Sequence, residues 1–336
     1  MKTIFLGTPE VSVPFLEILH KFTDVALVVT QPDRPRGRGM TVSPCPVKER
    51  AQALGLPVLS PEKISEIEAE IKAAGADYGV AVAYGQLLKE NIINIPKLGI
   101  INIHFSLLPK LRGAAPVQHA LFAGVEETGV TAFWIDKGMD TGPVFLKRTL
   151  PVTTDDDCKT LFEKLIPLGC KVLEDAAEHI RTNQIIRTPQ TVKMTSRVSE
   201  DTMYPLNVEI EEYPSPSSAP LIKREDTILD FNNMSATAIH NRVRGLACGP
   251  NARALIEIPS GKDTLQIIKT ALVNTPPAGN FNAGAAAGVD KDGAIIVKCI
   301  DGFLKILTLR PAGKKDMRAA DYLNGLKLKP EQILFY

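Results

Sequence analysis

Three side chains between residues 102 and 140 could together support acyl transfer to an amine: Asn102, His104 and Asp140. They supply an amide donor, a titratable imidazole and a carboxylate, and such a set needs no metal. Asn102 and His104 are two residues apart on the apolar run 98–104, which predicts a buried parallel strand. Both side chains should therefore lie on one face of a sheet, near the carboxyl end of the strand, where open α/β sheets bind ligands.

Each of these residues also has an ordinary structural interpretation. A single Asn-x-His pair at a strand end is more often structural than catalytic, because buried polar groups simply find partners. Asp140 begins the sequence Asp-Thr-Gly-Pro, which by itself is favourable for a turn. The motifs around the three residues decide between the two interpretations.

Four short motifs follow one another in this region. They are Asn-Ile-His at 102–104, Ser-Leu-Leu-Pro at 106–109, Arg-Gly-Ala-Ala-Pro at 112–116 and Asp-Thr-Gly-Pro at 140–143. Together they resemble the folate-dependent formyltransferase family. Further segments are similar to the branch of that family whose members formylate methionyl-tRNA: 5–10, 30–39, 46–48, 309–317 and 320–325. The resemblance covers nearly the whole chain and is weakest at about 191–225.

The resemblance implies transfer of the formyl group of 10-formyltetrahydrofolate to the amino group of initiator methionyl-tRNA, in support of translation initiation. Asn102 and protonated His104 are then expected to donate hydrogen bonds to the tetrahedral oxyanion, and His104 also to carry the proton that leaves the amine. Asp140 is expected to keep His104 charged and oriented, because a nearby carboxylate favours the protonated form of an imidazole.

The same resemblance implies where the two substrates bind. The folate, as formyl donor, is expected to contact Gln86, Leu87, Leu88, Ser106, Leu107, Leu108 and Pro109. The acceptor end of the tRNA is expected to meet a Pro- and Gly-rich loop that carries Arg34, Arg36 and Arg38. Guanidinium groups on such a loop can bind phosphates and stack on unpaired bases. On composition alone, a solvated charged loop is an equally good interpretation. No metal is expected, because the sequence offers no clustered ligands.

The spacing of apolar runs predicts an α/β fold for the first part of the chain. Runs rich in Val and Ile predict strands at 3–6, 25–29, 78–83, 100–104 and 130–135. Ser60-Pro61-Glu62 predicts the start of a helix that ends near Ala74, and Thr154-x-x-Asp157 predicts the start of another that ends near Arg181. The alternation predicts a Rossmann-like parallel sheet with helices on both faces. A dinucleotide site is poorly supported, because no G-x-G-x-x-G follows the first strand.

The pattern changes after residue 183. The Pro- and Ser-rich segment 213–220 predicts an exposed linker. A helix is predicted at 235–244, followed by short strands at 254–258, 265–271, 294–299 and 303–309. Such strands are typical of a small β-barrel, and the resemblance implies an OB-like one. The predicted domains are a catalytic domain at 1–183, a linker with an insertion at 184–225, and an OB-like tRNA-binding domain at 226–336.

Composition and charge agree with a two-domain enzyme. The 336 residues suffice for two cores. Residues 240–336 carry a net charge of +6 and the rest of the chain −5, which favours a polyanion-binding module beside a catalytic one. The 5 widely spaced cysteines predict free thiols in a reducing compartment. With no apolar run long enough for a membrane span, we expect a cytoplasmic monomer without a membrane partner.

Three other functions remain open from the sequence. A folate-dependent formyltransferase acting on a sugar or nucleotide amine would share the catalytic triplet. A formyltetrahydrofolate hydrolase would also need the histidine and the aspartate, but it has no use for an RNA-binding domain. An RNA-binding module without enzymatic activity would leave the triplet without a role. The basic C-terminal segment and the arginine loop favour tRNA as the acceptor.

Overall fold

The computed structural model describes residues 1–36, 41–190 and 216–336, so that Arg38 and most of the predicted linker lie outside the described residues. Contacts among its residues divide the chain into two compact units. The first unit comprises residues 1–116, 127–151 and 164–218, and the second comprises 117–126, 152–163 and 219–336.

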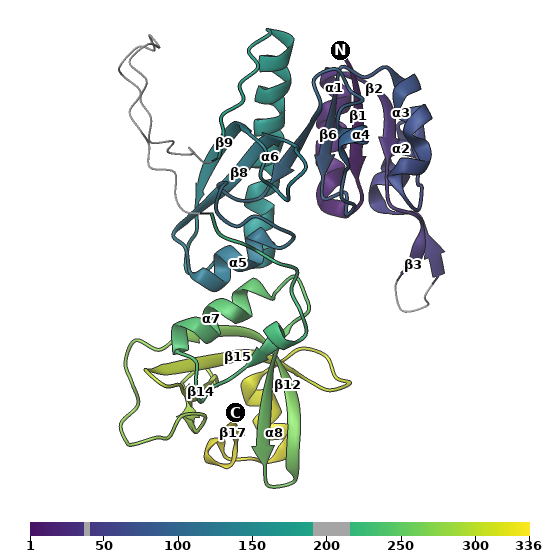
Figure 1. Ribbon diagram of the computed structural model, residues 1–336. Coiled ribbons are helices and arrows are strands. Elements are labelled where there is room, and N and C mark those ends of the chain that lie inside the picture. The colour runs from purple at the N-terminus through teal and green to yellow at the C-terminus, as the bar shows by residue number, and fades with distance from the viewer. Residues whose placement is uncertain (37–40, 191–215) are drawn as a thin grey trace, which may run out of the picture. The chain divides into compact units, whose positions relative to one another are not determined.

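The first unit is built on a seven-stranded sheet, whose strands carry the earlier colours of Figure 1. In spatial order they are β5 (Val58–Leu59), β2 (Asp24–Val29), β1 (Lys2–Gly7), β6 (Tyr78–Val82), β7 (Ile100–His104), β8 (Glu127–Trp134) and β9 (Val144–Pro151). All five predicted strands are present. The pairings from β5 to β7 are parallel, as predicted.

The last two strands depart from the prediction, because β8 pairs antiparallel with both β7 and β9. The expectation of a wholly parallel sheet is therefore wrong, and the sheet is mixed but mostly parallel. The connection from β8 to β9, residues 135–143, is too short for the crossover that a parallel pair requires. The sequence does not predict β9, because residues 147–149 in its middle are exposed and polar.

Helices cover both faces of the sheet, as the alternation predicts. They are α1 (Val13–Phe22), α2 (Pro46–Ala53), α3 (Glu68–Ala74), α4 (Glu90–Ile93) and α6 (Cys158–Arg181), with 3-10 turns at Glu10–Ser12 and Ile64–Ile67. On one face, Ile4 of β1 packs in a buried cluster with Ile71 of α3. On the other, Phe15 of α1 lies against Gly169 of α6, where an added methyl group would come within 2.8 Å of the Phe15 ring.

The helix predicted from Ser60 begins later than expected, as a 3-10 turn at Ile64 that becomes α3 at Glu68. The Ser60 hydroxyl, expected to cap the helix, is hydrogen-bonded to Thr30 at 2.9 Å. The side-chain amide of Gln86 occupies the backbone groups that a first helical turn would use, donating to the Glu62 carbonyl and accepting from the Ile64 N–H. A tertiary contact has therefore replaced the predicted helix start.

Helix α6 ends at Arg181, as predicted, but it begins at Cys158, later than the start predicted at Thr154, because Asp157 and not Thr154 caps it. Oδ1 of Asp157 accepts hydrogen bonds from the backbone N–H groups of Lys159 and Thr160, at 2.8 and 3.0 Å. The Thr160 hydroxyl in turn accepts the N–H of Asp157 at 2.9 Å. These reciprocal bonds satisfy donors that the helix itself leaves open.

The second unit is rich in β-structure. In spatial order, the strands of its sheet are β10 (Ile228–Leu229), β11 (Ala252–Ile258), β12 (Gly261–Leu272), β15 (Phe303–Pro311), β14 (Ile295–Lys298) and β13 (Ala286–Val289). Two short strands join this sheet: β16 (Met317–Arg318) pairs with β15, and β17 (Leu334–Phe335) pairs with β11. Helices α5 (Pro116–Ala123), α7 (Ala236–Gly245) and α8 (Ala319–Leu326) accompany it, with 3-10 turns at Glu225–Thr227 and Pro330–Gln332. The four predicted strands and the predicted helix are present, and Ser235 caps α7 by accepting the Ala238 N–H.

Candidate functional site

Strand β7 positions the first two candidate residues. It lies between β6 and β8, and Asn102 pairs with Ala81 on one side and Phe133 on the other. Because side chains alternate along a strand, Asn102 and His104 lie on the same face, as predicted. The His104 ring is buried, whereas Asn102 is half-buried and lines a cavity. The Asn102 amide makes no hydrogen bond to another described residue, which leaves it available to a ligand.

The hydrogen bonds of His104 identify which ring nitrogen carries its proton. Nε2 lies 2.9 Å from the carbonyl oxygen of Leu111. A carbonyl can only accept, so Nε2 donates, and Nδ1 of the neutral ring is left with a lone pair. Nδ1 faces Oδ2 of Asp140 at 3.8 Å. The ring therefore presents its basic nitrogen toward the carboxylate.

Burial decides the charge of His104 in the resting protein. Desolvation lowers the pKa of the imidazole below its ordinary value and outweighs the opposite effects of the Asp140 carboxylate and the Leu111 carbonyl. The Phe133 ring packs against the imidazole edge to face. The expectation that Asp140 keeps His104 protonated at rest is therefore wrong, because one carboxylate at 3.8 Å does not compensate for the lost water. A neutral imidazole is instead ready to accept a proton.

Asp140 is held in an uncommon backbone conformation. Its φ of 52° lies in the left-handed region, which few residues other than glycine adopt. Its Oδ2 accepts the backbone N–H of Gly113 at 2.7 Å. Asp140 does lie in a turn, so the structural and the catalytic interpretations of this residue are compatible.

A cavity of about 360 Å³ is lined by Asn102 and Asp140, whereas the His104 ring is not among its lining residues. Its lining includes Asn102, Asp140, Gly113 and the loop 83–88. Gln86, Leu87 and Leu88 are among the lining residues, as predicted, although the Gln86 amide is bonded to the backbone of residues 62 and 64. The exposed side chains of Leu87 and Met139 also line the cavity. Such apolar surface favours a ligand with a flat, partly apolar ring.

The predicted folate contacts at 106–109 are not among the residues that line this cavity. The Ser106 hydroxyl donates to the Lys110 carbonyl at 2.7 Å. Leu108 is buried against Phe133, and its backbone N–H donates to Thr131. This turn returns the chain toward residues 111–113, whose backbone contacts His104 and Asp140. A role for Ser106, Leu107, Leu108 and Pro109 in folate binding stays a prediction.

The predicted arginine loop begins as a short hairpin of β3 (Arg34–Arg36) and β4 (Thr41–Ser43). Lys48 anchors its base by donating to both carboxylate oxygens of Asp33 at 2.9 Å. Arg34 lies 3.4 Å from Glu62, but both side chains are exposed, and such pairs contribute little. The loop therefore has a fixed base, and its proposed contacts with nucleic acid stay a prediction.

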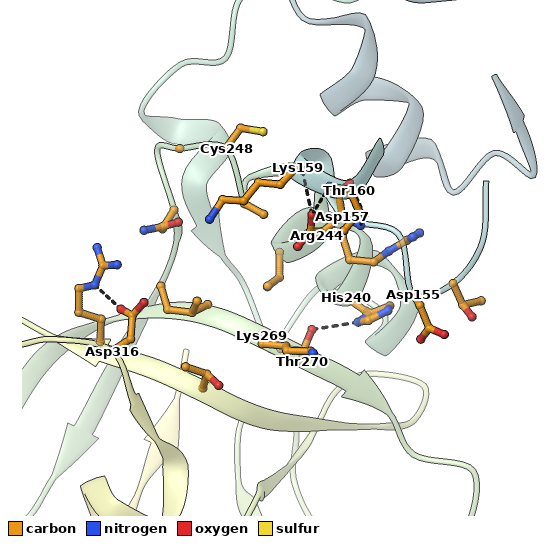
Figure 2. Close-up of a pocket in the computed structure, with 18 residues that line it drawn as sticks. Asp155, Asp157, Lys159, Thr160, His240, Arg244, Cys248, Lys269, Thr270 and Asp316 are labelled. Atoms are coloured by element: carbon orange, nitrogen blue, oxygen red, sulfur yellow. Dashed lines mark hydrogen bonds and ion pairs between the residues drawn. The ribbon is translucent and has the colours of Figure 1, made fainter. Parts of the chain in front are cut away.

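The second unit contains a larger cavity, of about 570 Å³ (Figure 2). The charged residues of its lining are four basic ones, Lys159, Arg244, Lys269 and Arg310, and three acidic ones, Asp155, Asp157 and Asp316. Neither lysine is ion-paired with another described residue, whereas Arg310 is paired with Asp316. Two unpaired ammonium groups in one cavity suit a ligand with several negative charges. The sequence analysis did not single out these lysines.

Two absences hold for residues 1–36, 41–190 and 216–336. Within them, no three His, Cys, Asp or Glu side chains are grouped so that they could bind a metal ion. No described helix combines the length and the apolar character needed to cross a bilayer.

The sequence analysis also missed two residues behind the site, Arg112 and Gln190. The Arg112 guanidinium donates two hydrogen bonds to Oε1 of Gln190, whose Nε2 donates to the Asp140 carbonyl. Arg112 begins the Arg-Gly-Ala-Ala-Pro motif at 112–116, so the sequence could have suggested a role for it. Gln190 lies 50 residues after Asp140, and no local pattern connects the two.

Comparison with known proteins gives consistent matches along the chain. Residues 1–176 match the model of the family described as formyl transferase, and residues 221–327 match that of the formyl transferase C-terminal domain. A methionyl-tRNA formyltransferase of Elusimicrobium minutum is 59% identical over 340 residues, covering 100% of both chains. One of Ruminiclostridium cellulolyticum is 35% identical, over 98% of this chain and 97% of that protein.

Solved structures show the same fold at low identity. WlaRD, a sugar 3N-formyl transferase solved in the presence of dTDP and 5-N-formyl-THF, aligns with a TM-score of 0.60 and 18% identity, over 94% of this chain and 99% of that one. HypX from Aquifex aeolicus in complex with tetrahydrofolic acid aligns with a TM-score of 0.58 and 14% identity, over 96% of this chain and 47% of that one.

Proposed function

This chain belongs to the formyl transferase family, in its methionyl-tRNA formyltransferase branch, and we propose that Asn102, His104 and Asp140 carry out its reaction. The reaction moves the formyl group of 10-formyltetrahydrofolate to the amino group of methionyl-tRNA, and it supplies formylmethionyl-tRNA for translation initiation. The observation that carries the assignment of residues is the convergence of a free amide and a carboxylate in one cavity, with the basic Nδ1 of His104 facing that carboxylate.

The proposed chemistry begins with attack of the amine nitrogen on the formyl carbon. The new C–N bond pushes an electron pair onto the formyl oxygen, and the Asn102 amide donates to this oxyanion. Nδ1 of His104 takes the proton that leaves the amine, and Asp140 stabilises the imidazolium that results. When the oxyanion collapses, the bond to N10 of the folate breaks, and N10 takes the proton from His104. Since the side chains supply both donor and base, the proposed route needs no metal.

We assign the folate to the cavity beside β7. The loop 83–88 supplies main-chain donors and acceptors for a planar heterocycle, and the exposed Leu87 would pack on its face. The turn 106–109 would lie along the formyl-bearing part of the folate, because it leads into the backbone that holds His104 and Asp140.

We assign the tRNA to the arginine loop and to the second unit. The two unpaired lysines of the 570 Å³ cavity support this assignment, as does the net positive charge of residues 240–336. We further propose that the second unit is an OB-like barrel and the first a Rossmann-like domain. In support of the barrel, Ala285 beside β13 bridges Leu334 of β17, and β17 pairs with β11. The enzyme would work as a monomer in the cytoplasm, beside the translation apparatus.

The test is to incubate the protein with 10-formyltetrahydrofolate labelled in its formyl group, with and without methionyl-tRNA, and to follow the label. Formylmethionyl-tRNA is the expected product, and tRNA binding should weaken steeply with salt as counterions are displaced from phosphates. Release of formate regardless of tRNA would indicate a hydrolase. Transfer to a sugar or nucleotide amine but not to tRNA would indicate the small-amine branch. Salt-dependent tRNA binding with no movement of label would indicate an RNA-binding module.

Replacement of Arg38 by alanine should reduce use of methionyl-tRNA far more than binding of folate, because the loop is proposed to touch only the nucleic acid. Loss of one charge-assisted contact predicts a roughly tenfold or greater fall in kcat/KM for the tRNA. The measurement is steady-state kinetics with each substrate varied in turn. Arg181→Ala, which removes an exposed arginine of α6, is the matched control and should leave both constants unchanged. Equal losses toward both substrates would assign the loop to the folate site or to stability.

The buried neutral His104 predicts that the protein becomes less stable as the pH falls below about 6.5. The folded-state pKa is lower than the unfolded one, so between the two values the unfolded chain binds more protons and is favoured. Stability from this group is therefore present above the unfolded pKa and lost toward acid. Urea unfolding at several pH values, compared with His104→Gln, checks this: the variant should show a weaker pH dependence. Identical slopes would mean that folding leaves the pKa of His104 unchanged, and a steeper loss of stability toward acid in the variant would mean that folding raises this pKa.

A further inference from the structure

A single buried glutamine connects the two loops that hold the proposed catalytic histidine and aspartate. Gln190 is 2% exposed and does not line the catalytic cavity. Its Oε1 accepts from Nε and Nη2 of Arg112 at 3.0 and 2.7 Å. Its Nε2 donates to the carbonyl oxygens of Asp140 and Gly142 at 2.9 and 2.8 Å. Both amide donors are used, and the amide oxygen accepts twice, so its hydrogen-bonding capacity is filled.

One side of this contact fixes the backbone of Asp140. A non-glycine residue at a φ of 52° is strained and keeps that conformation only where its surroundings impose it. The Gln190 amide holds the carbonyl of Asp140 itself and that of Gly142, two residues later. Gly142 is also closely enclosed, since an added methyl group would collide with the Trp134 carbonyl. The turn therefore has few alternatives while Gln190 is in place.

The other side of the contact fixes the loop at 111–113. Arg112 stands between Leu111, whose carbonyl accepts the His104 Nε2 proton, and Gly113, whose N–H donates to the Asp140 carboxylate. The backbone N–H of Arg112 donates to the Ser217 carbonyl, which ties the loop down a second time. Arg112 and Gln190 thus join the element that orients the imidazole to the element that orients the carboxylate.

We propose that Gln190, acting through Arg112, is a positioning residue that sets the placement of Asp140 relative to His104. It touches no reacting atom. This inference rests on the proposed roles of His104 and Asp140. If it holds, loss of the contact lowers the rate of the chemical step and leaves substrate binding nearly intact, because the residues proposed to bind folate and tRNA are held by other contacts.

The test compares Gln190→Leu and Gln190→Glu in the full chain. Leucine removes every hydrogen bond, whereas glutamate keeps an acceptor for Arg112 but cannot donate to the Asp140 and Gly142 carbonyls. For both we expect kcat to fall about tenfold to a hundredfold, as misplacement of catalytic groups does. KM for 10-formyltetrahydrofolate and for methionyl-tRNA should stay within about threefold of wild type. Arg112→Lys, which keeps the charge but loses the two-pronged contact, should give a smaller loss of kcat than Gln190→Leu.

Two further measurements separate positioning from simple support of the fold. Thr3→Val removes partly buried side-chain hydrogen bonds to Thr23 and Asp24 in the same unit, away from the site, and should lower Tm without changing kcat below the melting range. NMR titration of ¹⁵N-labelled histidines should show the His104 pKa lower in Gln190→Leu than in wild type. Asp140 is the titratable group that faces this ring, and its influence weakens when it moves away.

The outcomes distinguish this inference from the proposed function. A wild-type protein that transfers no formyl group to methionyl-tRNA overturns the function itself. An active wild type together with wild-type kcat in any folded variant of Gln190, or in Arg112→Lys, overturns the positioning role alone. A rise in both KM values with unchanged kcat also overturns it, because it would place the contact in substrate binding. If Gln190→Leu does not fold, Gln190→Glu and Arg112→Lys decide the question.

Discussion

His104→Ala is expected to lower formyl transfer to methionyl-tRNA at least about a hundredfold, with the fold intact. The variant removes the group proposed to take the proton from the attacking amine and to return it to the folate nitrogen. The Leu111 carbonyl that accepts from Nε2 is left without this partner, so a modest loss of stability should accompany the loss of activity. Single-turnover transfer of label, measured beside a thermal unfolding curve, separates the two effects.

Asp140→Asn tests the same proton transfer through the carboxylate that faces His104, and it should lower formyl transfer by a similar factor. Asparagine tolerates the left-handed conformation, and its oxygen can still accept the Gly113 N–H, so the turn should persist. What is lost is the negative charge that stabilises an imidazolium at 3.8 Å. The matched control is His179→Ala on α6, which removes a histidine whose ring is hydrogen-bonded to the Asp175 carbonyl and does not line the catalytic cavity. Near wild-type transfer by His104→Ala or Asp140→Asn would remove that residue from the mechanism.

Asn102→Ala should reduce kcat by about a hundredfold to a thousandfold, the usual effect of losing one oxyanion donor. The affinity for the folate should change little, because the developing negative charge is present only in the transition state. The side-chain amide of Asn102 makes no hydrogen bond to other described residues, so its loss should leave Tm nearly unchanged. Rapid-quench measurement of the first turnover gives the rate of the chemical step directly.

Two comparisons sharpen this prediction. Asn102→Asp has the same shape but replaces a donor by a negative charge beside the oxyanion, and it should be at least as slow as the alanine variant. Asn91→Ala removes a surface asparagine that bonds to Glu68, and it should transfer at the wild-type rate. If the first turnover of Asn102→Ala matches wild type, the oxyanion is stabilised by other groups.

The sequence alone determined much of the first unit, because its signals are local. The strands at 3–6, 25–29, 78–83 and 100–104 follow from apolar composition bounded by turn residues, and all four are present. The end of α6 near Arg181 follows from the local sequence, whereas its start was predicted a few residues too early, at Thr154. The placement of Asn102 and His104 on one face needs only the period of a strand.

Tertiary contacts decided what local rules could not. The side chain of Gln86 reaches residues 62 and 64 and postpones the start of α3. The segments 117–126 and 152–163 pack with the second unit, although they lie within the sequence of the first. Phe122 lies under the Arg242 guanidinium, and Arg244 donates to the carbonyls of Thr153 and Asp156. Contacts between such distant residues leave no periodic trace in a single sequence.

The three proposed catalytic residues show the same difference between local and tertiary information. Asn102, His104 and Asp140 were selected from the sequence because the motifs around them resemble those of a known family, and their catalytic role stays a proposal. The charge of His104 was not predictable, because it depends on how completely the folded chain excludes water from the ring, and burial prevails over the nearby carboxylate. The role proposed for Gln190 could not be predicted for a related reason. It depends on the two loops that Gln190 joins, and only the folded chain brings those loops together.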